Sequence, residues 1–267
     1  MNGRIIGIIA IKGGVGKTTT VSNLAAALAN DFGKKVLVVD ANFTAPNLGI
    51  HLGIVNPQYT LHDVLANKID VPKAIQKHEL GFDIIAGSLV PKCKIDPFSL
   101  KRKINHLRYK YDVILIDSSP TLNEEMLATM IAADELLVVS SPDYPTLSCT
   151  MRAVKVAKMK KTPITGIVLN RVRRKKYELT LDDIEQSVDV PIVSIVPEDE
   201  MVLEALSLTK PAVMHAPGRN VSIEYKKLAG CLIGEQYKDT RLWPKIRGFF
   251  INEDVRKDEV NRTIAKK

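Results

Sequence analysis

A glycine-rich run between an apolar segment and a predicted helix constrains the fold of this chain more than any other feature. The run extends from Lys12 to Thr19 and reads KGGVGKTT. The apolar segment before it, residues 5–11, predicts a buried strand, and residues 21–29 after it are rich in Ala and Leu and predict a helix. At such a strand-to-helix turn, backbone N–H groups of the helix N-terminus can bind an anion. The run therefore predicts a phosphate-binding turn after the first strand.

The side chains of this run suit a nucleotide phosphate site. Its glycines carry no Cβ, so the backbone can approach phosphate oxygens closely. Lys17 is placed to neutralise the β- and γ-phosphates, and the Thr18 hydroxyl is placed to bind Mg²⁺. The usual pattern G-x-x-x-x-G-K-[ST] has a glycine where this chain has Ile11, and Lys12 stands directly before the glycines. We expect the nucleotide to contact Gly13, Gly14, Val15, Gly16, Lys17, Thr18 and Thr19.

Apolar runs of strand length recur along the chain, separated by stretches of helical character. Besides residues 5–11, they lie at 35–39, 82–85, 112–116, 136–139, 164–169 and 192–196. Continuous apolar runs are typical of strands buried on both faces, because helices cover both sides of a parallel sheet. The pattern predicts an α/β fold with a doubly wound, mainly parallel sheet and helices on both faces. With 267 residues, the chain fits one such domain, at residues 1–237, and a tail at 238–267.

Polar residues stand at the carboxyl ends of several predicted strands. Asp40 follows the second apolar run, Asp117 closes the run at 112–116, and Asn170 follows a later one. The carboxyl ends of parallel strands share one edge of a sheet, and ligands bind there. We therefore expect these side chains to gather beside the glycine-rich run, with Asp117 holding Mg²⁺.

The KGGVGKTT run, with its two lysines, resembles the deviant Walker A motif of the MinD/ParA family of P-loop ATPases. The resemblance covers about residues 3–237 and is closest to the MinD-like branch of archaea and bacteria. It implies a P-loop NTPase fold, ATP and Mg²⁺ as cofactors, and a homodimer that forms on ATP. In that family the leading lysine, here Lys12, reaches the nucleotide of the partner, while the second, here Lys17, serves its own.

The resemblance also implies roles for residues outside the glycine-rich run. The segment that starts at Asp40 resembles switch I, and the apolar run that ends at Asp117 matches Walker B. The implied Mg²⁺ ligands are Thr18, Asp40 and Asp117, and the implied catalytic residues are Lys12, Lys17, Asp40 and Asn42. Two later segments resemble the family's base-contact segments, which implies adenine contacts from Asn170, Arg171, Pro197 and Glu198.

Asn42 stands where members of that family commonly carry a second aspartate that helps to orient the attacking water. An amide oxygen can accept a hydrogen bond from water, but the amide carries no negative charge and takes no proton. We therefore predict slow hydrolysis and a long-lived ATP state. The alternative is that a neighbouring group supplies this function and that Asn42 is incidental.

The composition of the chain changes after Tyr237. Residues 238–267 are highly charged, with an apolar island at 242–251 whose large side chains fall on one face of a helix and whose flanks are basic. This pattern predicts an interfacial anchor for an anionic membrane surface, and a dimer that presents two copies binds more tightly than one. The alternative is that the aromatic residues of the island pack on the domain.

Basic surface offers a second way to hold an acidic partner. The chain carries a net charge of +8, which favours nucleic acid or an anionic membrane as a partner. Arg152, Lys155 and Lys158 recur every third residue on a predicted helix, and a basic cluster lies at 171–176. In ParA-like ATPases such surfaces hold nonspecific DNA, whereas an ordinary solvated helix face is the alternative.

The lack of targeting signals and the spacing of the cysteines bear on the cellular location of the protein. Apolar runs stay well below the roughly 18 residues of a membrane span, and the glycine-rich run begins too early to leave room for a signal peptide. Cys93, Cys149 and Cys231 lack C-x-x-C spacing, which argues against a metal site or a disulfide framework. We expect a cytoplasmic protein that attaches to the membrane, if it does, only peripherally.

Taken with the resemblance, these patterns favour a MinD-like ATPase that hydrolyses ATP slowly and acts as a spatial-positioning switch. It would attach reversibly to a membrane or a partner. We also expect an activating or cargo protein, which the sequence does not identify. Two alternatives stay open. One is a ParA-like ATPase that binds nonspecific DNA, and the other is a nucleotide-binding switch with negligible hydrolysis.

Overall fold

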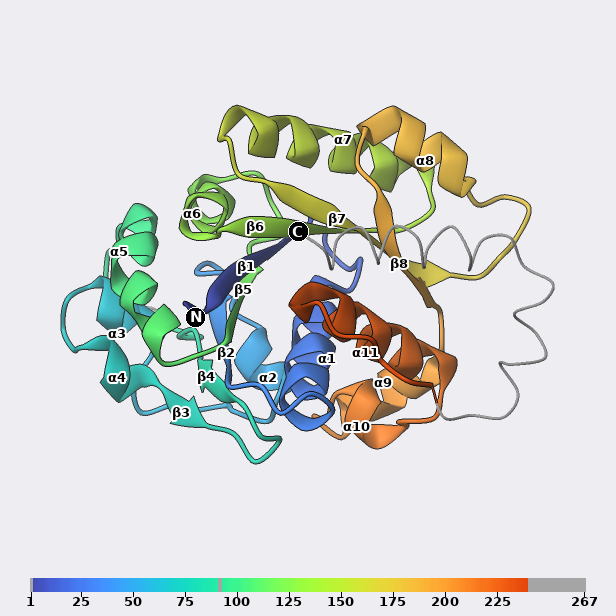
Figure 1. The fold of residues 1–267 in the computed structure, drawn as a ribbon. Coiled ribbons are helices and arrows are strands. Elements are labelled where there is room, and N and C mark those ends of the chain that lie inside the picture. Colours follow the sequence, from blue (N-terminus) through green and yellow to red (C-terminus); the bar gives the residue numbers. More distant parts are fainter. Residues whose placement is uncertain (1, 91–92, 240–267) are drawn as a thin grey trace.

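The computed structural model describes residues 2–90 and 93–239 and shows a central sheet between two layers of helices (Figure 1). The strands form one eight-stranded sheet in the order β3-β4-β2-β5-β1-β6-β7-β8. Their bounds are β1 Arg4–Ile9, β2 Val36–Ala41, β3 Gln76–Lys77, β4 Asp83–Ile85, β5 Val113–Ser118, β6 Glu135–Ser140, β7 Ile164–Val172 and β8 Ile192–Pro197.

All neighbouring strands of this sheet are parallel except β3 and β4, which pair antiparallel at the edge. The predicted doubly wound, mainly parallel α/β fold is therefore confirmed, and each predicted strand is present. The first strand ends at Ile9 rather than at residue 11, because the chain turns into the glycine-rich run there. The pattern did not predict β3, since two residues are too few to show an alternation.

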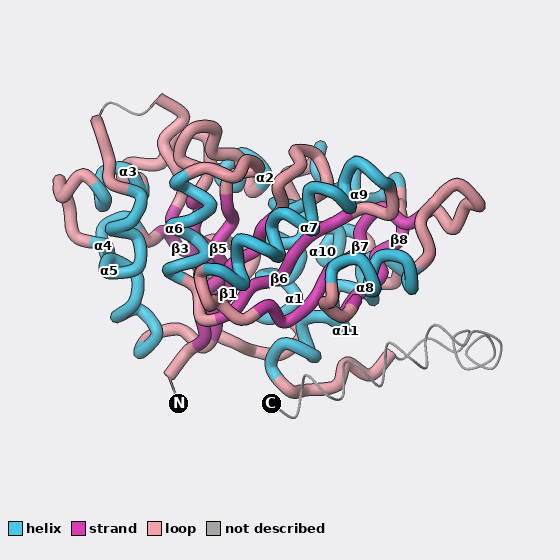
Figure 2. Tube along the Cα trace, turned by 90° about the horizontal axis from the view of Figure 1, so that it is seen from above, coloured by secondary structure: helices cyan, strands magenta, loops and turns pink. Residues whose placement is uncertain are grey.

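Helices connect the strands and cover both faces of the sheet. The α-helices are α1 Lys17–Asn30, α2 Leu48–His51, α3 Leu61–Leu65, α4 Val71–Ala74, α5 Leu100–Ile104, α6 Glu124–Ala132, α7 Tyr144–Met159, α8 Leu181–Val188, α9 Glu200–Ser207, α10 Ala212–His215 and α11 Asn220–Ile233. Two 3₁₀ turns, η1 Pro97–Ser99 and η2 Asn105–Tyr109, flank α5. Figure 2 shows α6, α7 and α8 lying over the strands on one side of the sheet, with α1 and α11 behind them.

Neighbouring residues of β1 face opposite layers, which is why the whole strand is apolar. Ile6 and Ile8 pack in the cluster that includes α1 and α11, whereas Ile5 and Ile9 pack against the helices of the other face. Each fully buried side chain of this size contributes about 1.5–3 kcal/mol to folding. The central strand is thus fixed from both sides, and so is the turn that follows it.

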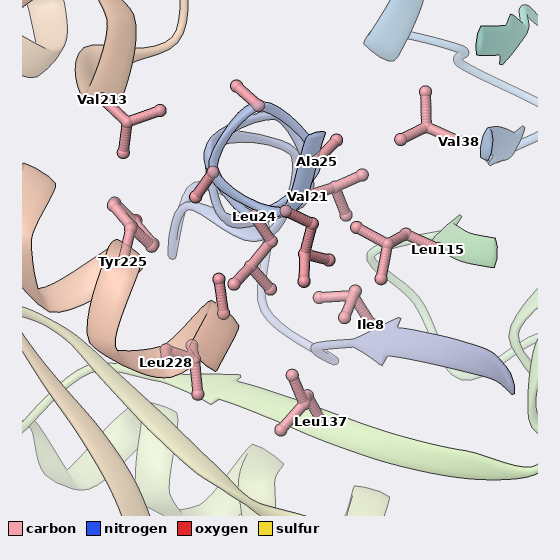
Figure 3. Close-up of a cluster of buried hydrophobic side chains, with 14 of the residues drawn as sticks. Ile8, Val21, Leu24, Ala25, Val38, Leu115, Leu137, Val213, Tyr225 and Leu228 are labelled. Carbon is pink, nitrogen blue, oxygen red and sulfur yellow. The ribbon is translucent and has the colours of Figure 1, made fainter. Parts of the chain in front are cut away.

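Helix α1, which follows the glycine-rich run, is enclosed between the sheet and α11. Leu24 points towards Tyr225 and Leu228 of α11, while Val21 faces Leu115 of β5 (Figure 3). All residues of α1 from Thr20 to Leu28 are buried. Because the helix is packed on several sides, its N-terminus and the preceding turn are held at a fixed place on the sheet.

The chain continues past α11 onto the C-terminal end of α1. The ring of Tyr237 meets that of Phe32 edge-on, with the centroids 6.4 Å apart. Residues 240–267, with the predicted anchor at 242–251, lie outside the described residues. Among the described residues, no helix is both long enough and apolar enough to cross a membrane.

Candidate functional site

The glycine-rich run forms a turn in which two glycines have free space where a side chain would begin, whereas a third glycine is in close contact with a neighbouring residue. Gly14 and Gly16 have φ values of 80° and 92°, which favour glycine over any residue with a Cβ. A Cβ added at Gly13 or Gly14 would meet no atom within 4 Å. At Gly16 it would lie 2.1 Å from the amide nitrogen of Asn170. The backbone at the open glycines is thus accessible to an anion at the N-terminus of α1.

Lys17 and Thr18 begin α1 and both reach Asp117, at the end of β5. The ammonium of Lys17 lies 2.6 Å from one carboxylate oxygen of Asp117, and the Thr18 hydroxyl donates to the other at 2.7 Å. The side chains of Lys17 and Asp117 are 7% and 1% exposed. A buried lysine that can exchange this carboxylate for phosphate oxygens is well placed to bind an anion at the open turn.

Asp40 lies near the carboxyl end of β2 beside Asp117, because the two residues are partners in the parallel register of β2 and β5. Its side chain is fully buried, and its oxygens accept hydrogen bonds from the backbone of Asn42 at 3.2 Å and of Leu48 at 3.0 Å. Burial and the charge of Asp117 raise the pKa of Asp40 to about 8. At neutral pH the folded, nucleotide-free chain therefore keeps Asp40 protonated, and a divalent cation bound between Asp40 and Asp117 would favour release of that proton.

The oxygen donors at this edge fit Mg²⁺ in chemical type. Asp40, Asp117 and Thr18 provide carboxylate and hydroxyl oxygens, the ligands that this hard cation prefers. Thr18 and Asp117 are already in contact, and Asp40 is adjacent to Asp117 in the sheet. These residues can hold Mg²⁺ next to a phosphate bound at the open turn.

Asn42 follows β2 and lies in a tight loop rather than free at the edge. Its backbone N–H donates to Asp40, and its side-chain amide nitrogen donates to the carbonyl of Ala45. The residue is 5% exposed. The side-chain nitrogen is thus engaged in holding the loop, which leaves the amide oxygen as the group that can accept a hydrogen bond from water.

Lys12 lies apart from Lys17 and turns outward to the N-terminus of α7. Its ammonium is 3.1 Å from Asp143 and 2.8 Å from the Thr146 hydroxyl, and the side chain is 41% exposed. Partial burial raises the pKa of Asp143, but hydrogen bonds from Ser141, Thr146 and Lys12 outweigh it and bring the pKa to about 2. The two lysines of the run therefore face different surroundings, one buried and one at the surface.

The predicted base-contact residues divide into two groups. Asn170, in β7, is buried and donates its side-chain N–H to the carbonyl of Val15 at 2.7 Å, so it touches the glycine-rich turn directly. Pro197 ends β8, opposite Val172 of β7, while Arg171 is exposed. Glu198 is exposed and forms an ion pair with Arg173. The structure thus places Asn170 against the glycine-rich turn, whereas Glu198 is paired with Arg173.

Two acidic residues that sequence reasoning missed support this edge. Asp143 receives Lys12, and its position before a Tyr-Pro pair at a helix start is a signal that could have identified it as an N-cap. Glu125 of α6 accepts hydrogen bonds from the loop that follows β2. Its sequence context carries no such signal, because the contact joins residues far apart in the chain.

Comparisons with known proteins agree with this geometry. Residues 3–167 match the AAA domain family. An ATP-binding protein of Methanocaldococcus jannaschii is 37% identical over 234 residues, which cover 86% of this chain and 88% of that protein. The septum site-determining protein MinD of Thermotoga maritima is 30% identical over 243 residues, which cover 87% of this chain and 89% of that protein.

Solved structures show the same relationship. The cell division ATPase MinD of Pyrococcus furiosus has a TM-score of 0.81 and 36% identity, covering 85% of this chain and 97% of that one. The septum site-determining protein MinD of Pyrococcus horikoshii, complexed with Mg-ADP, has a TM-score of 0.80 and 35% identity, covering 85% and 94%. The chain therefore belongs to the MinD/ParA family of P-loop ATPases, and its cofactors are ATP and Mg²⁺.

Proposed function

We propose that this protein is a MinD-like ATPase that binds Mg·ATP at the described edge of the sheet, dimerises on ATP and hydrolyses it slowly to ADP and phosphate. In this role it is a spatial-positioning switch with reversible attachment to a membrane or a partner. The observation that carries the proposal is the contact of Lys17 and Thr18 with Asp117, made by the residues that closely follow the open backbone of Gly13 and Gly14 in the chain.

The same contacts suggest how ATP is bound. Lys17 leaves Asp117 and donates to the phosphate oxygens, while the N–H groups of the turn bind the same anion. Asp117, Asp40 and Thr18 then present their oxygens to the cation. Mg²⁺, when bound, neutralises phosphate charge and stabilises the charge that develops on the transferred phosphoryl group. Asn170 keeps the turn in place through Val15, and its amide oxygen remains for the adenine edge.

Dimerisation on ATP is supported by the position of Lys12. Its side chain lies at the surface against Asp143 and is 41% exposed. An exposed ion pair of this kind contributes about 0–1 kcal/mol. The lysine can therefore leave Asp143 at small cost and contact a nucleotide held by a second copy of the chain.

Slow hydrolysis is supported by Asn42, whose side chain has no carboxylate and whose nitrogen is bound to Ala45. The residue can orient a water molecule through its amide oxygen but cannot take its proton. Under this proposal the ATP-bound state persists long enough for the protein to bind a membrane or a partner protein.

Sedimentation velocity of the full chain tests the proposal, with released phosphate measured on the same samples. We expect a monomer with Mg·ADP and a dimer with Mg·ATP, together with turnover below about 1 s⁻¹, the lower end of ordinary enzyme rates. Lys12→Ala is expected to bind ATP and stay monomeric, whereas Lys17→Ala is expected to lose both properties. A wild-type chain that stays monomeric with Mg·ATP would contradict the proposed switch.

The place of attachment needs a separate experiment, because residues 242–251 lie outside the described part of the chain. The full chain and a chain ending at Tyr237 can be sedimented with vesicles of anionic phospholipid, each with ATP and with ADP. We expect only the full chain with ATP to sediment with the vesicles. Binding that ignores the nucleotide or the tail would exclude the anchor.

Nonspecific DNA is a second candidate partner, favoured by the outer face of α7. Arg152 and Lys155 are exposed there and form no ion pair within residues 2–90 and 93–239. If DNA binds at this face, the affinity falls steeply as salt is raised. Titration of a random duplex at several salt concentrations checks this, and a flat salt dependence excludes it.

A further inference from the structure

Two loops leave the nucleotide edge side by side. The register of β2 and β5 pairs Asp40 with Asp117 and Ala41 with Ser118, so both chains leave the sheet at the same level. From β2 the chain enters residues 42–47, which we call the 42–47 loop, and from β5 it leads into α6. A contact between the loop and α6 would therefore link the surroundings of Asp40 with those of Asp117.

The 42–47 loop is bound to Asp40 at both of its ends. One oxygen of Asp40 accepts from the backbone of Asn42 at 3.2 Å, and the other accepts from the backbone of Leu48 at 3.0 Å. A displacement of the loop must therefore stretch these bonds or move the Asp40 carboxylate. The position of the loop is in this way part of the geometry of the nucleotide site.

Glu125 of α6 holds the middle of the same loop with both of its carboxylate oxygens. One oxygen accepts the backbone N–H of Phe43 at 3.0 Å, and the other accepts the hydroxyl of Thr44. From the other side of Phe43, the ring of His62 lies 3.0 Å from its carbonyl oxygen. Both polar groups of the Phe43 backbone are thus held by side chains from other parts of the chain.

The surroundings of Glu125 argue against a role in charge pairing. The residue is 8% exposed, and it forms no salt bridge within the described part of the chain. Its carboxylate instead accepts hydrogen bonds from the loop and lies in the first turn of α6, where the helix dipole favours a negative charge. A buried carboxylate without a cationic partner contributes less to stability than an apolar side chain of similar size, so its contacts with the loop account better for its presence.

We propose that Glu125 is a positioning residue for ATP hydrolysis. It couples the 42–47 loop to α6 and thereby keeps Asp40 and Asn42 in place at the nucleotide edge. This inference rests on the proposed ATP site. Glu125 contacts the loop rather than the nucleotide, so its loss should lower kcat for ATP while leaving the KM for Mg·ATP nearly unchanged.

The test compares Glu125→Ala and Glu125→Gln with the matched control Glu124→Ala, whose side chain is exposed on the same turn. A glutamine can accept the Phe43 N–H through its oxygen and donate to the Thr44 hydroxyl through its nitrogen, so it preserves both contacts. We expect kcat to fall about tenfold or more in Glu125→Ala, because small displacements of reacting groups cost this much or more. The glutamine and control variants should stay within about twofold of wild type.

Hydrogen exchange of the nucleotide-free chain separates failure of this inference from failure of the proposed ATPase. Loss of the coupling should speed exchange at the Phe43 amide and also at Asn42 and Leu48, by about tenfold in Glu125→Ala and little in Glu125→Gln. A wild-type chain that hydrolyses no ATP would contradict the proposed function, while the exchange result would still decide whether Glu125 holds the loop.

Three results would overturn the inference. They are unchanged kcat in Glu125→Ala, a Glu125→Gln variant as slow as the alanine variant, or exchange at Asn42 and Leu48 that does not respond. If Glu125→Ala does not fold, Thr44→Val decides the question, because it removes one of the two loop donors from a side chain at the surface. We expect about threefold lower kcat in Thr44→Val, and unchanged kcat there also overturns the inference.

Discussion

Two Lys–Asp pairs of similar length lie in opposite surroundings in this protein. Lys17 and Asp117 are 2.6 Å apart at the nucleotide edge, with side chains 7% and 1% exposed. Lys158 and Asp189 are 2.9 Å apart across α7 and the end of α8, with side chains 52% and 92% exposed. The atoms and distances are nearly alike, so the difference between the two pairs comes from burial.

Burial changes what each pair can do. Water and salt screen the exposed pair, and its two charges are stable apart as well as together. The buried pair has replaced water by a few fixed partners, so removing one partner leaves an uncompensated charge. The buried pair is therefore sensitive to a ligand that offers Lys17 a different anion, whereas the exposed pair has no such dependence.

Truncation of the two lysines should give the largest contrast. We expect Lys17→Ala to lower the free energy of unfolding by about 3–5 kcal/mol, because Asp117 loses its buried partner. Lys158→Ala should change it by less than about 1 kcal/mol. Urea unfolding at neutral pH measures both values. Similar losses in the two variants would mean that burial does not distinguish the pairs.

Burial should also make the stability of the protein depend on pH through Asp40. Its pKa is raised to about 8 by burial and by Asp117, so between about pH 4 and pH 8 the folded chain holds a proton that the unfolded chain has released. This contribution makes the nucleotide-free protein less stable as the pH rises through that window. Asp40→Asn removes it, so we expect the variant to gain about 2 kcal/mol or more on wild type from pH 5 to pH 8.

The same pH series with Asp189→Asn provides the control, because Asp189 is 92% exposed. Its stability relative to wild type should not depend on pH over this range. A stability difference between Asp40→Asn and wild type that is also independent of pH would contradict this account, because burial should make only Asp40 sensitive to pH in this range.

Asn42→Asp tests whether the rate of hydrolysis depends on this one side chain. An aspartate can carry a charge and take a proton, which supports the attacking water better than an amide does. We expect turnover to rise by about tenfold, measured as phosphate release at saturating Mg·ATP. Unchanged or lower turnover would show that Asn42 is incidental and that another group orients the water.

The smallest effect is expected on the outer face of α7. This face borders a groove of about 690 Å³ between α7 and α8, lined in part by Met151, Arg152, Lys155 and Met159. The double variant Arg152→Ala, Lys155→Ala should keep the free energy of unfolding within about 0.5 kcal/mol of wild type, since both side chains are exposed. A larger loss would assign these cations a structural role.

Much of the fold was predictable because its strongest signals are local. The apolar runs of β1 and β5 are buried on both faces, and the glycines between β1 and α1 lie within a few residues of each other. Parallel strands place their carboxyl ends at one edge, which is why Asp40 and Asp117 could be expected to meet. These inferences need only the sequence pattern and the topology.

What the sequence did not reveal depends on contacts between distant parts of the chain. Glu125 meets the 42–47 loop only after β2 and β5 have paired, and the hold of Asp143 on Lys12 requires α7 to begin beside the glycine-rich turn. Strand β3 is too short to give a pattern. For Glu125 and Asp143 the missing information is tertiary, since these residue types alone are equally typical of a solvated surface or a turn.

The central claim is that the buried Lys17 and Asp117 mark the Mg·ATP site, and isothermal titration calorimetry tests it most directly. The full wild-type chain and Lys17→Ala are titrated with ATP in the presence and absence of Mg²⁺. We predict one ATP bound per wild-type chain, weaker binding without Mg²⁺, and no detectable heat of binding with Lys17→Ala. Binding of Mg·ATP by a folded Lys17→Ala variant with the wild-type affinity would contradict the claim.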